Sequence, residues 1–338
     1  MRSLSLKRAA ASSRAEAGCG TEAAKQPPAA GHKKKKLSRA DLIENVKLYA
    51  LMSPVLLHIF IFSYIPLYGI VIAFQDYYPG APFMSFDGST KWVGLKHFIN
   101  FFSDPYFGRL VYNTIYLNLL GLVLGFTAPI IFAILLNEIT NAKFKKFAQT
   151  ASYLPHFISM VVVAGMVISF INGEGLINQF LALFGVPPRP YTVDPKAFPW
   201  VLILTGIWKG FGWGSILYLS NITSIDPGLY ESAKLDGANR GQRMLHITLP
   251  SLKNLILIQL IFAVGGLLSS STETILLLYT PATYETADVI GTYVYRMGIE
   301  GGKFSATSAI GLFTTVINFT LLFICNKITT KVADYGLW

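Results

Sequence analysis

The sequence is poor in charge and in the residue patterns that build catalytic or metal sites. Asp, Glu, Lys and Arg make up 14% of its 338 residues, against about 25% in soluble domains. There are only two cysteines, and the five histidines are scattered singly along the chain. No GxxxxGKS/T loop, HExxH pair or GxSxG turn occurs. The chain is therefore predicted to be no enzyme, to hold no cofactor, and to bind no ATP through a phosphate loop of its own.

Apolar residues, by contrast, make up 52% of the chain and gather in six long segments. Each segment is near or above the roughly 20 residues that a membrane-spanning helix needs. The first and fifth are long enough to tilt or to extend past the bilayer. The sequence thus predicts an all-α integral membrane protein with six transmembrane helices. These lie at about residues 48–74, 111–137, 150–172, 199–222, 250–280 and 305–327.

The distribution of Lys and Arg predicts which side of the membrane each loop occupies. With the N-terminus inside, 20 of the 28 Lys and Arg residues fall in inner segments and seven in outer loops, while Lys209 lies within a predicted span. Because inner loops carry the excess of positive charge, both termini are predicted to be cytoplasmic. Cys19 and Cys325 then face the reducing side, so we expect neither a disulfide nor a metal site.

Residues 1–37 differ in composition from everything that follows. They are rich in Ala, Ser, Lys and Pro and contain the basic run Lys33–Lys36. A segment poor in large apolar residues cannot build a core, so this basic cytoplasmic tail is predicted to be disordered. The membrane domain then covers residues 38–338. Most of the net charge of +10 lies in the first 47 residues, and no nucleic acid is needed to explain it.

A polar segment at about residues 226–248 separates the fourth and fifth apolar stretches. It is too charged to cross a bilayer and too amphipathic to be a loop without regular structure. Asp226-Pro227 is typical of a helix start, with a side-chain acceptor followed by a residue that suits the first turn. The pattern predicts a short helix of about two turns, a sharp break at Asp236-Gly237, and a second short helix from Arg240 to Leu245. Such a shape is suited to contact with a partner.

The order and spacing of residues in this segment resemble a family pattern. Glu231-x-Ala233, then Asp236-Gly237-Ala238 and Ile247-x-Leu249-Pro250 are similar to the EAA loop of permease subunits of binding-protein-dependent ABC importers. Ser232 replaces the first alanine of that pattern, a small-for-small change. The alternative is an ordinary cytosolic amphipathic loop. The resemblance implies a set of residues that couple the chain to an ATPase: Glu231, Ser232, Ala233, Asp236, Gly237, Ala238, Arg240, Leu249 and Pro250.

The resemblance covers most of residues 45–338. It is to the maltose-type, MetI-like carbohydrate permeases, and within them to a subgroup associated with complex oligosaccharides. It implies the type I importer permease fold, in which one chain lines half of a translocation path, so residues 38–338 would form the permease domain. Supporting residues are Asn113-Thr114, Trp208-Lys209, Asp288-Val289-Ile290, Thr292–Arg296, Ala309–Leu312 and Tyr335–Trp338.

The family also implies a set of partners. These are a second homologous permease chain, two ATPase subunits that bind ATP and Mg²⁺, an extracytoplasmic solute-binding protein, and an oligosaccharide substrate. The expected location is the bacterial inner membrane. A stand-alone ion-coupled secondary sugar transporter is the alternative function, but it does not explain the Glu231 segment.

The fourth and fifth spans hold the candidate substrate path, because sugars are held by aromatic faces and polar side chains. The fourth supplies Trp208, Lys209, Trp213 and Tyr218. A lysine near the bilayer centre costs roughly 2.5–3.5 kcal/mol, so Lys209 should face a cavity or a partner. Either it meets an acidic sugar, such as an alginate oligosaccharide, or it is paired with Glu273 or the second permease. Ser270 and Glu273 belong to a polar run, residues 269–274, which either lines the path, the reading we favour, or makes interhelical hydrogen bonds.

Overall fold

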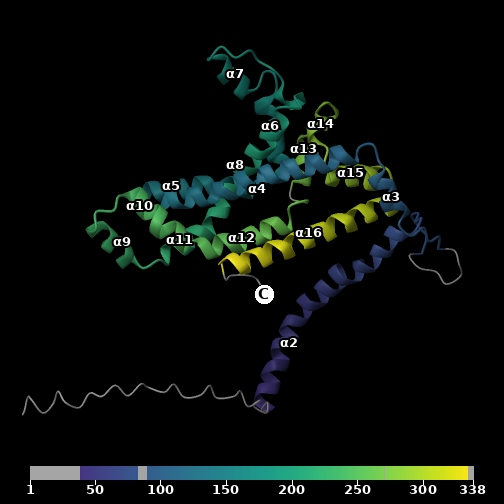
Figure 1. The fold of residues 1–338 in the computed structure, drawn as a ribbon, viewed down its shortest axis with the longest axis horizontal. Coiled ribbons are helices and arrows are strands. Elements are labelled where there is room, and N and C mark those ends of the chain that lie inside the picture. The colour runs from purple at the N-terminus through teal and green to yellow at the C-terminus, as the bar shows by residue number, and fades with distance from the viewer. Residues whose placement is uncertain (1–38, 83–89, 270, 334–338) are drawn as a thin grey trace, which may run out of the picture. The chain divides into compact units, whose positions relative to one another are not determined.

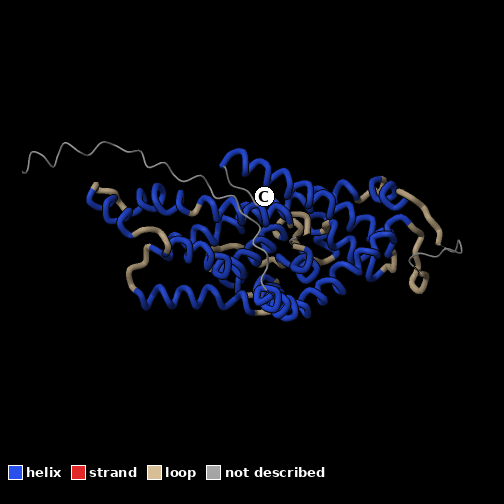
Figure 2. The backbone as a smooth tube through the Cα atoms, turned by 90° about the horizontal axis from the view of Figure 1, so that it is seen from below, coloured by secondary structure: helices blue, strands red, loops and turns tan. Residues whose placement is uncertain are grey.

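The computed structural model describes residues 39–82, 90–269 and 271–333. Predictions for the tail at residues 1–37, for Cys19 and for Ser270 lie outside these ranges. Within them the chain is helical, and the only extended pairing is an isolated bridge between Gln75 and Trp92. Figure 2 shows helices joined by loops throughout the described part. The all-α expectation is confirmed.

The chain divides into two compact units, residues 1–65 and residues 66–338. The described part of the first consists of α2 (Arg39–Ile59), a π-helical turn at Phe60–Tyr64, and the start of a 3₁₀ stretch, Ile65–Phe74. Residues Asn45–Phe74 are long and apolar enough to cross a membrane, where the sequence analysis expected a span at 48–74.

Two long helices form the centre of the second unit. Helix α4 (Phe107–Asn137) and helix α8 (Phe198–Thr223) pack side by side along most of their length (Figure 1). Near their first residues, Leu117 of α4 shares an apolar cluster with Phe198 of α8. Near their last residues, Ile130 shares a second cluster with Tyr218. The two helices therefore run in the same direction.

The expected third span at 150–172 is not one helix. The chain forms α5 (Ala142–Tyr153), a 3₁₀ turn at Leu154–Phe157, and then α6 (Met160–Ile171) and α7 (Leu176–Ala182). Pro155 lies in the break and cannot donate a main-chain hydrogen bond. The Ser159 hydroxyl accepts from Val162 N and starts α6. Because a new helix begins there, the segment that qualifies as a span is Met160–Ala182.

The expected fifth span at 250–280 is also interrupted. Helix α12 (Lys253–Gly265) ends at Gly266, and α13 (Thr272–Leu278) follows. Asn318 of α16 (Phe304–Ala333) accepts a hydrogen bond from Leu268 N at 3.1 Å, which satisfies a main-chain group freed by the break. Before α12 the chain bends by 60° from the segment Arg240–Ser251.

The remaining short helices lie at the two ends of the α4–α8 pair (Figure 1). We call the part around residues 224–251 the α9 end and the part around residues 281–300 the α15 end. In the described part of the chain, five helices are long and apolar enough to span a membrane, or six with the bent pair. The short helices are α3 (Lys96–Phe102), α9 (Pro227–Leu235), α10 (Arg240–Arg243), α11 (Leu249–Ser251), α14 (Tyr284–Ala287) and α15 (Ile290–Tyr295).

Candidate functional site

Helix α9 is delimited by local signals at both ends. The Asp226 carboxylate accepts a hydrogen bond from Gly228 N at 2.9 Å, and Pro227 occupies the first turn. At the other end, Ala238 N donates to Ala233 O at 2.8 Å and Gly237 N donates to Lys234 O at 3.1 Å. This pair of bonds is the Schellman motif, which needs a left-handed residue after the helix. Gly237 supplies it, with a φ of 81°.

The chain restarts at once after Gly237. The side chains of Asn239 and Gln242 each accept a hydrogen bond from the other residue's main-chain N–H, which forms a capping box at the start of α10. The second helix does not end at Leu245, as expected, because a π-helical turn at Met244–Thr248 carries the chain into α11. Tyr230 hydrogen-bonds to the buried Thr248 hydroxyl at 2.9 Å, so α9 and the following helix are held together.

These helices present apolar side chains outwards. Leu235 is 90% exposed at the tip of α9, and Leu229 and Leu245 are also exposed. Glu231 is exposed and has no hydrogen-bond or ion-pair partner among the described residues, while the Ser232 hydroxyl donates to Gly228 O within its own helix. A hollow of about 290 Å³ lies beside the break, lined by Ala233, Asp236, Gly237, Ala238, Gln242, Arg243, His246 and Ile247. The segment thus has the features of a surface that contacts another protein.

Lys209 lies on the side of α8 that faces the break between α5 and α6. Its ammonium donates to His156 O at 2.9 Å and to Ile158 O at 2.7 Å. These carbonyls belong to the interrupted stretch, which leaves main-chain acceptors without helical partners. Glu273, the partner considered from sequence, is exposed and makes no ion pair with Lys209. The structure therefore pairs Lys209 with main-chain carbonyls of the same chain.

Lys209→Met tests this pairing. Loss of the ammonium leaves two part-buried carbonyls without a donor, which costs roughly 1–3 kcal/mol for each group. We expect a clear fall in the thermal unfolding temperature of the purified chain in detergent. Lys253→Met, the same change at an exposed lysine, should leave it unaltered. Recovery of stability in a Lys209→Met, Glu273→Gln double variant would show instead that the lysine is paired with Glu273.

The other candidate path residues lie in different surroundings. Tyr218 is 4% exposed and belongs to the apolar cluster near the α9 end. Trp213 is 45% exposed and stacks on the His156 ring, with centroids 4.5 Å apart. Trp208 lines a cavity between α6 and α8. The residues of the expected path are therefore not gathered around one space.

The polar run at 269–274 makes hydrogen bonds to neighbouring helices. Ser271 donates to the Asn118 side chain of α4 at 3.0 Å, and Asn318 of α16 donates to the Ser269 hydroxyl at 3.2 Å. These contacts support interhelical bonding, the less favoured of the two roles considered for the run. Glu273 lies in the first turn of α13 and remains available to other groups.

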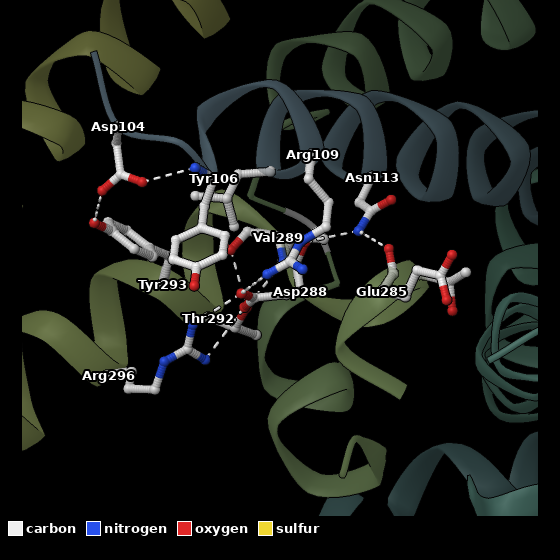
Figure 3. Close-up of polar contacts among 12 residues, drawn as sticks. Asp104, Tyr106, Arg109, Asn113, Glu285, Asp288, Val289, Thr292, Tyr293 and Arg296 are labelled. Atoms are coloured by element: carbon white, nitrogen blue, oxygen red, sulfur yellow. Dashed lines mark hydrogen bonds and ion pairs between the residues drawn. The ribbon is translucent and has the colours of Figure 1, made fainter. Parts of the chain in front are cut away.

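A buried ionic network lies at the α15 end (Figure 3). The Asp288 side chain is 1% exposed and receives both Arg296 nitrogens, at 2.8 and 3.2 Å. The Thr292 hydroxyl donates to the same carboxylate at 2.8 Å, and an Arg109 nitrogen lies 3.7 Å from it. Hydrogen bonds to Asp288 raise the pKa of the Arg296 guanidinium. Because two cations surround one anion, the network carries a net positive charge.

The same network attaches α4 to the segment around α14 and α15. Asn113 donates to Glu285 O at 2.9 Å and to Asp288 O at 3.0 Å (Figure 3). Thr114 accepts from Ile290 N at 2.9 Å. In the sequence, Asn113-Thr114 and Asp288–Arg296 stand out only as parts of a family resemblance. The structure shows that they bond to one another across more than 170 residues of chain.

A tyrosine–carboxylate contact lies on the side of the network towards α3. The Tyr293 hydroxyl donates to Asp104 at 2.7 Å, and the other oxygen of that carboxylate accepts from Tyr106 N at 2.8 Å. Burial of the phenol, together with the bond to Asp104, raises the pKa of Tyr293. No pattern in the sequence indicated this contact, because its two side chains are 189 residues apart.

The chain is similar in sequence and in fold to known transport permeases. The chain is 41% identical over 307 residues to the polygalacturonan/rhamnogalacturonan transport system permease protein YteP of Bacillus subtilis (strain 168), covering 90% of this chain and 94% of that protein. It is 38% identical to LplB of the same organism, with 86% and 91% covered. A chain of the crystal structure of a bacterial ABC transporter involved in the import of the acidic polysaccharide alginate matches with a TM-score of 0.79 and 37% identity, covering 87% of this chain and 98% of that chain.

The family model matches a continuous stretch of the second unit. It covers residues 121–333 and so includes the segment from Asp226 to Ser251 and most of the long helices. The resemblance to MetI-like carbohydrate importer permeases is confirmed. The protein is a multi-pass membrane protein that belongs to the family of binding-protein-dependent transport system inner membrane components.

Proposed function

We propose that this chain is the permease subunit of an ATP-driven importer that carries oligosaccharides into the cytoplasm from a solute-binding protein. The observation that carries the proposal is the segment from Asp226 to Ser251. It combines an exposed short helix, a glycine-dependent break and a second helix that continues, bent, into α12. A permease needs such a rigid projection to follow the motion of an ATPase, and a stand-alone transporter does not.

The partners and the orientation follow from the same proposal. A second homologous permease completes the path, and two ATPase subunits that bind ATP and Mg²⁺ contact the α9 end. The excess of Lys and Arg on that side supports a cytoplasmic location for the α9 end and for both termini. The solute-binding protein then approaches the α15 end. The assembly lies in the bacterial inner membrane.

The coupling mechanism is a two-state equilibrium that the nucleotide state shifts. When the ATPase subunits close, α9 moves with them, and the contact between Tyr230 and Thr248 passes the motion to the π-helical turn before α12. Glu231 is exposed and offers its carboxylate for a charge-assisted hydrogen bond to the ATPase. The exposed Leu235 supplies apolar contact area at the tip.

The proposed substrate class is an acidic oligosaccharide. The names of the relative YteP and of the alginate importer support this choice. The half-exposed Trp213 offers an aromatic face to sugar C–H groups, and Glu273 lies free for hydroxyl groups. Lys209 contributes by holding the α5–α6 break in place beside Trp213, since its ammonium is bonded to main-chain carbonyls.

Gly237→Val is expected to uncouple the importer without preventing membrane insertion. A β-branched residue at a φ of 81° costs on the order of 1–3 kcal/mol, which the local break cannot absorb without changing shape. ATPase subunits should co-purify more weakly, and sugar-stimulated ATP hydrolysis in proteoliposomes should be lost.

Gly237→Asn is the matched control, because asparagine tolerates the left-handed region. It should retain most of the coupled activity. Unchanged coupling in Gly237→Val would show that the break does not transmit motion. Sugar uptake by liposomes that contain this chain alone would favour the secondary transporter instead.

A further inference from the structure

A cavity of about 710 Å³ lies between α6, α7 and the first half of α8. The segment that precedes α8, residues 189–197, closes one end of it. Thr286 bonds to Pro195 of this segment, so that end of the cavity belongs to the α15 end of the molecule. Neither the coupling segment nor the ionic network around Asp288 contributes to it.

The walls of the cavity offer almost no hydrogen bonds. Between Met166 and Ile177 on one side, and between Trp200 and Leu204 on the other, the lining residues are apolar. Thr205 is the exception, but its hydroxyl donates to Val201 O at 2.6 Å within α8. A sugar placed here would leave its hydroxyl groups unsatisfied, which costs free energy for each group. The walls therefore suit a hydrocarbon chain better than a carbohydrate.

The rim of the cavity, by contrast, is charged. Arg189 lies over the Tyr191 ring at 4.7 Å and 3.6 Å from the Asp194 carboxylate. Lys196 is exposed, and its ammonium has no partner among the described residues. Two cations and one anion leave the rim with an excess of positive charge.

The rim is held in place by a buried side chain. Asn178 of α7 is 1% exposed, donates to Arg189 O at 2.8 Å and accepts from Arg189 N at 3.2 Å. The main chain that carries Arg189 is thus fixed against α7. The guanidinium projects from a fixed position while remaining exposed to water.

The length of the cavity matches one membrane leaflet. From Phe198, where α8 begins, to Trp208 the helix rises by about 15 Å, and half of a hydrocarbon core is also about 15 Å. Trp200 is exposed one turn after Lys196, at the depth where tryptophans gather at the membrane interface. The charged rim then lies at the level of the lipid headgroups and the apolar walls at the level of the acyl chains.

We propose that this cavity binds an anionic phospholipid, with one acyl chain between α6 and α8 and the phosphate beside Lys196 and Arg189. In the orientation proposed above, the lipid belongs to the outer leaflet. It would hold α6 and α7 against α8. In this way it would also support the stretch between α5 and α6 whose carbonyls accept hydrogen bonds from Lys209. The site is separate from the coupling segment and does not depend on the identity of the sugar.

The test uses the complete importer, purified with its partner subunits and placed in nanodiscs of equal parts phosphatidylglycerol and phosphatidylcholine. After release into detergent, native mass spectrometry counts the lipids that remain bound. We expect phosphatidylglycerol to be retained in preference. Lys196→Gln should weaken its retention roughly five-fold, the equivalent of about 1 kcal/mol for one cation near a membrane surface. Lys303→Gln, which removes a cation from a different cavity, should change nothing.

A second variant tests the apolar part of the cavity. Leu204→Trp fills the space from an exposed position on α8 and should lower retention of both lipids without loss of the assembled complex. Equal retention of the two lipids by the unmodified complex would overturn the headgroup assignment. Unchanged lipid counts in Leu204→Trp would show that the lipid does not bind in this cavity. A photoreactive group at residue 204 that labels the second permease and no lipid would show that a helix of the partner covers this face.

Discussion

Asp288→Asn is expected to cause the largest loss of stability of any single change considered for this chain. Asparagine has the same size but no charge, so Arg296 and Arg109 would face each other without an anion. Removing one partner of a buried ion pair costs on the order of 3–5 kcal/mol. The yield of monodisperse protein in detergent and its thermal unfolding temperature should both fall sharply.

The control for this change is Asp194→Asn, which removes a half-buried carboxylate from its pair with the exposed Arg189. Surface pairs contribute little, so its unfolding temperature should stay near that of the unmodified chain. In a double-mutant cycle, Arg296→Gln should cost less in the Asp288→Asn background than alone, because the pair is already broken. Additive losses would mean that the two side chains do not stabilise each other.

Gly212→Ala is expected to destabilise the chain by forcing two packed helices apart. A Cβ atom at this position would overlap the Ser152 carbonyl oxygen at the end of α5. The neighbour is main chain, which cannot rotate away, so α5 and α8 must separate. Overpacking of this kind costs typically 1–3 kcal/mol. The separation would also disturb the hydrogen bonds from Lys209 to the carbonyls between α5 and α6. Both effects should lower the thermal unfolding temperature in detergent.

The same helix provides the matched control for Gly212→Ala. A Cβ atom at Gly206 or Gly210 would meet nothing within 4 Å. Gly210→Ala should therefore be neutral or slightly stabilising, since alanine is favoured over glycine in a helix by about 1 kcal/mol. If Gly212→Ala and Gly210→Ala behave alike in the purified chain, the contact between α5 and α8 is not as close as the structure shows.

The glycines of α8 show what a sequence pattern can predict about helix packing and what it cannot. Four glycines at Gly206, Gly210, Gly212 and Gly214 are typical of tight helix packing. Only two of them are packed tightly, Gly212 against Ser152 and Gly214 against Pro129. The pattern indicated that α8 approaches a neighbour closely, but not which of its faces does so. That depends on where α4 and α5 lie around it.

The breaks within the third and fifth expected spans were not predicted, because hydropathy does not detect them. Hydropathy measures whether a segment can lie in a membrane, and residues 150–172 and 250–280 qualify whether or not they are continuous. Pro155 and Gly266 mark the breaks, but such residues are also tolerated within spanning helices. Lys209 donates to a freed carbonyl at the first break, and Asn318 accepts from a freed N–H at the second.

The sequence by itself determined the membrane character of this protein and the break at Gly237 in the segment from Asp226 to Ser251. The first depends on composition, and the second on bonds among near neighbours, from the Asp226 cap through Gly237 to the Asn239 capping box. Only the tertiary structure decided the partners of the charged side chains. Lys209 bonds to carbonyls more than 50 residues away, and Asp288 lies beside Arg109 in the first turn of α4. A buried charge must find a partner in space, and its distance along the chain does not indicate which one.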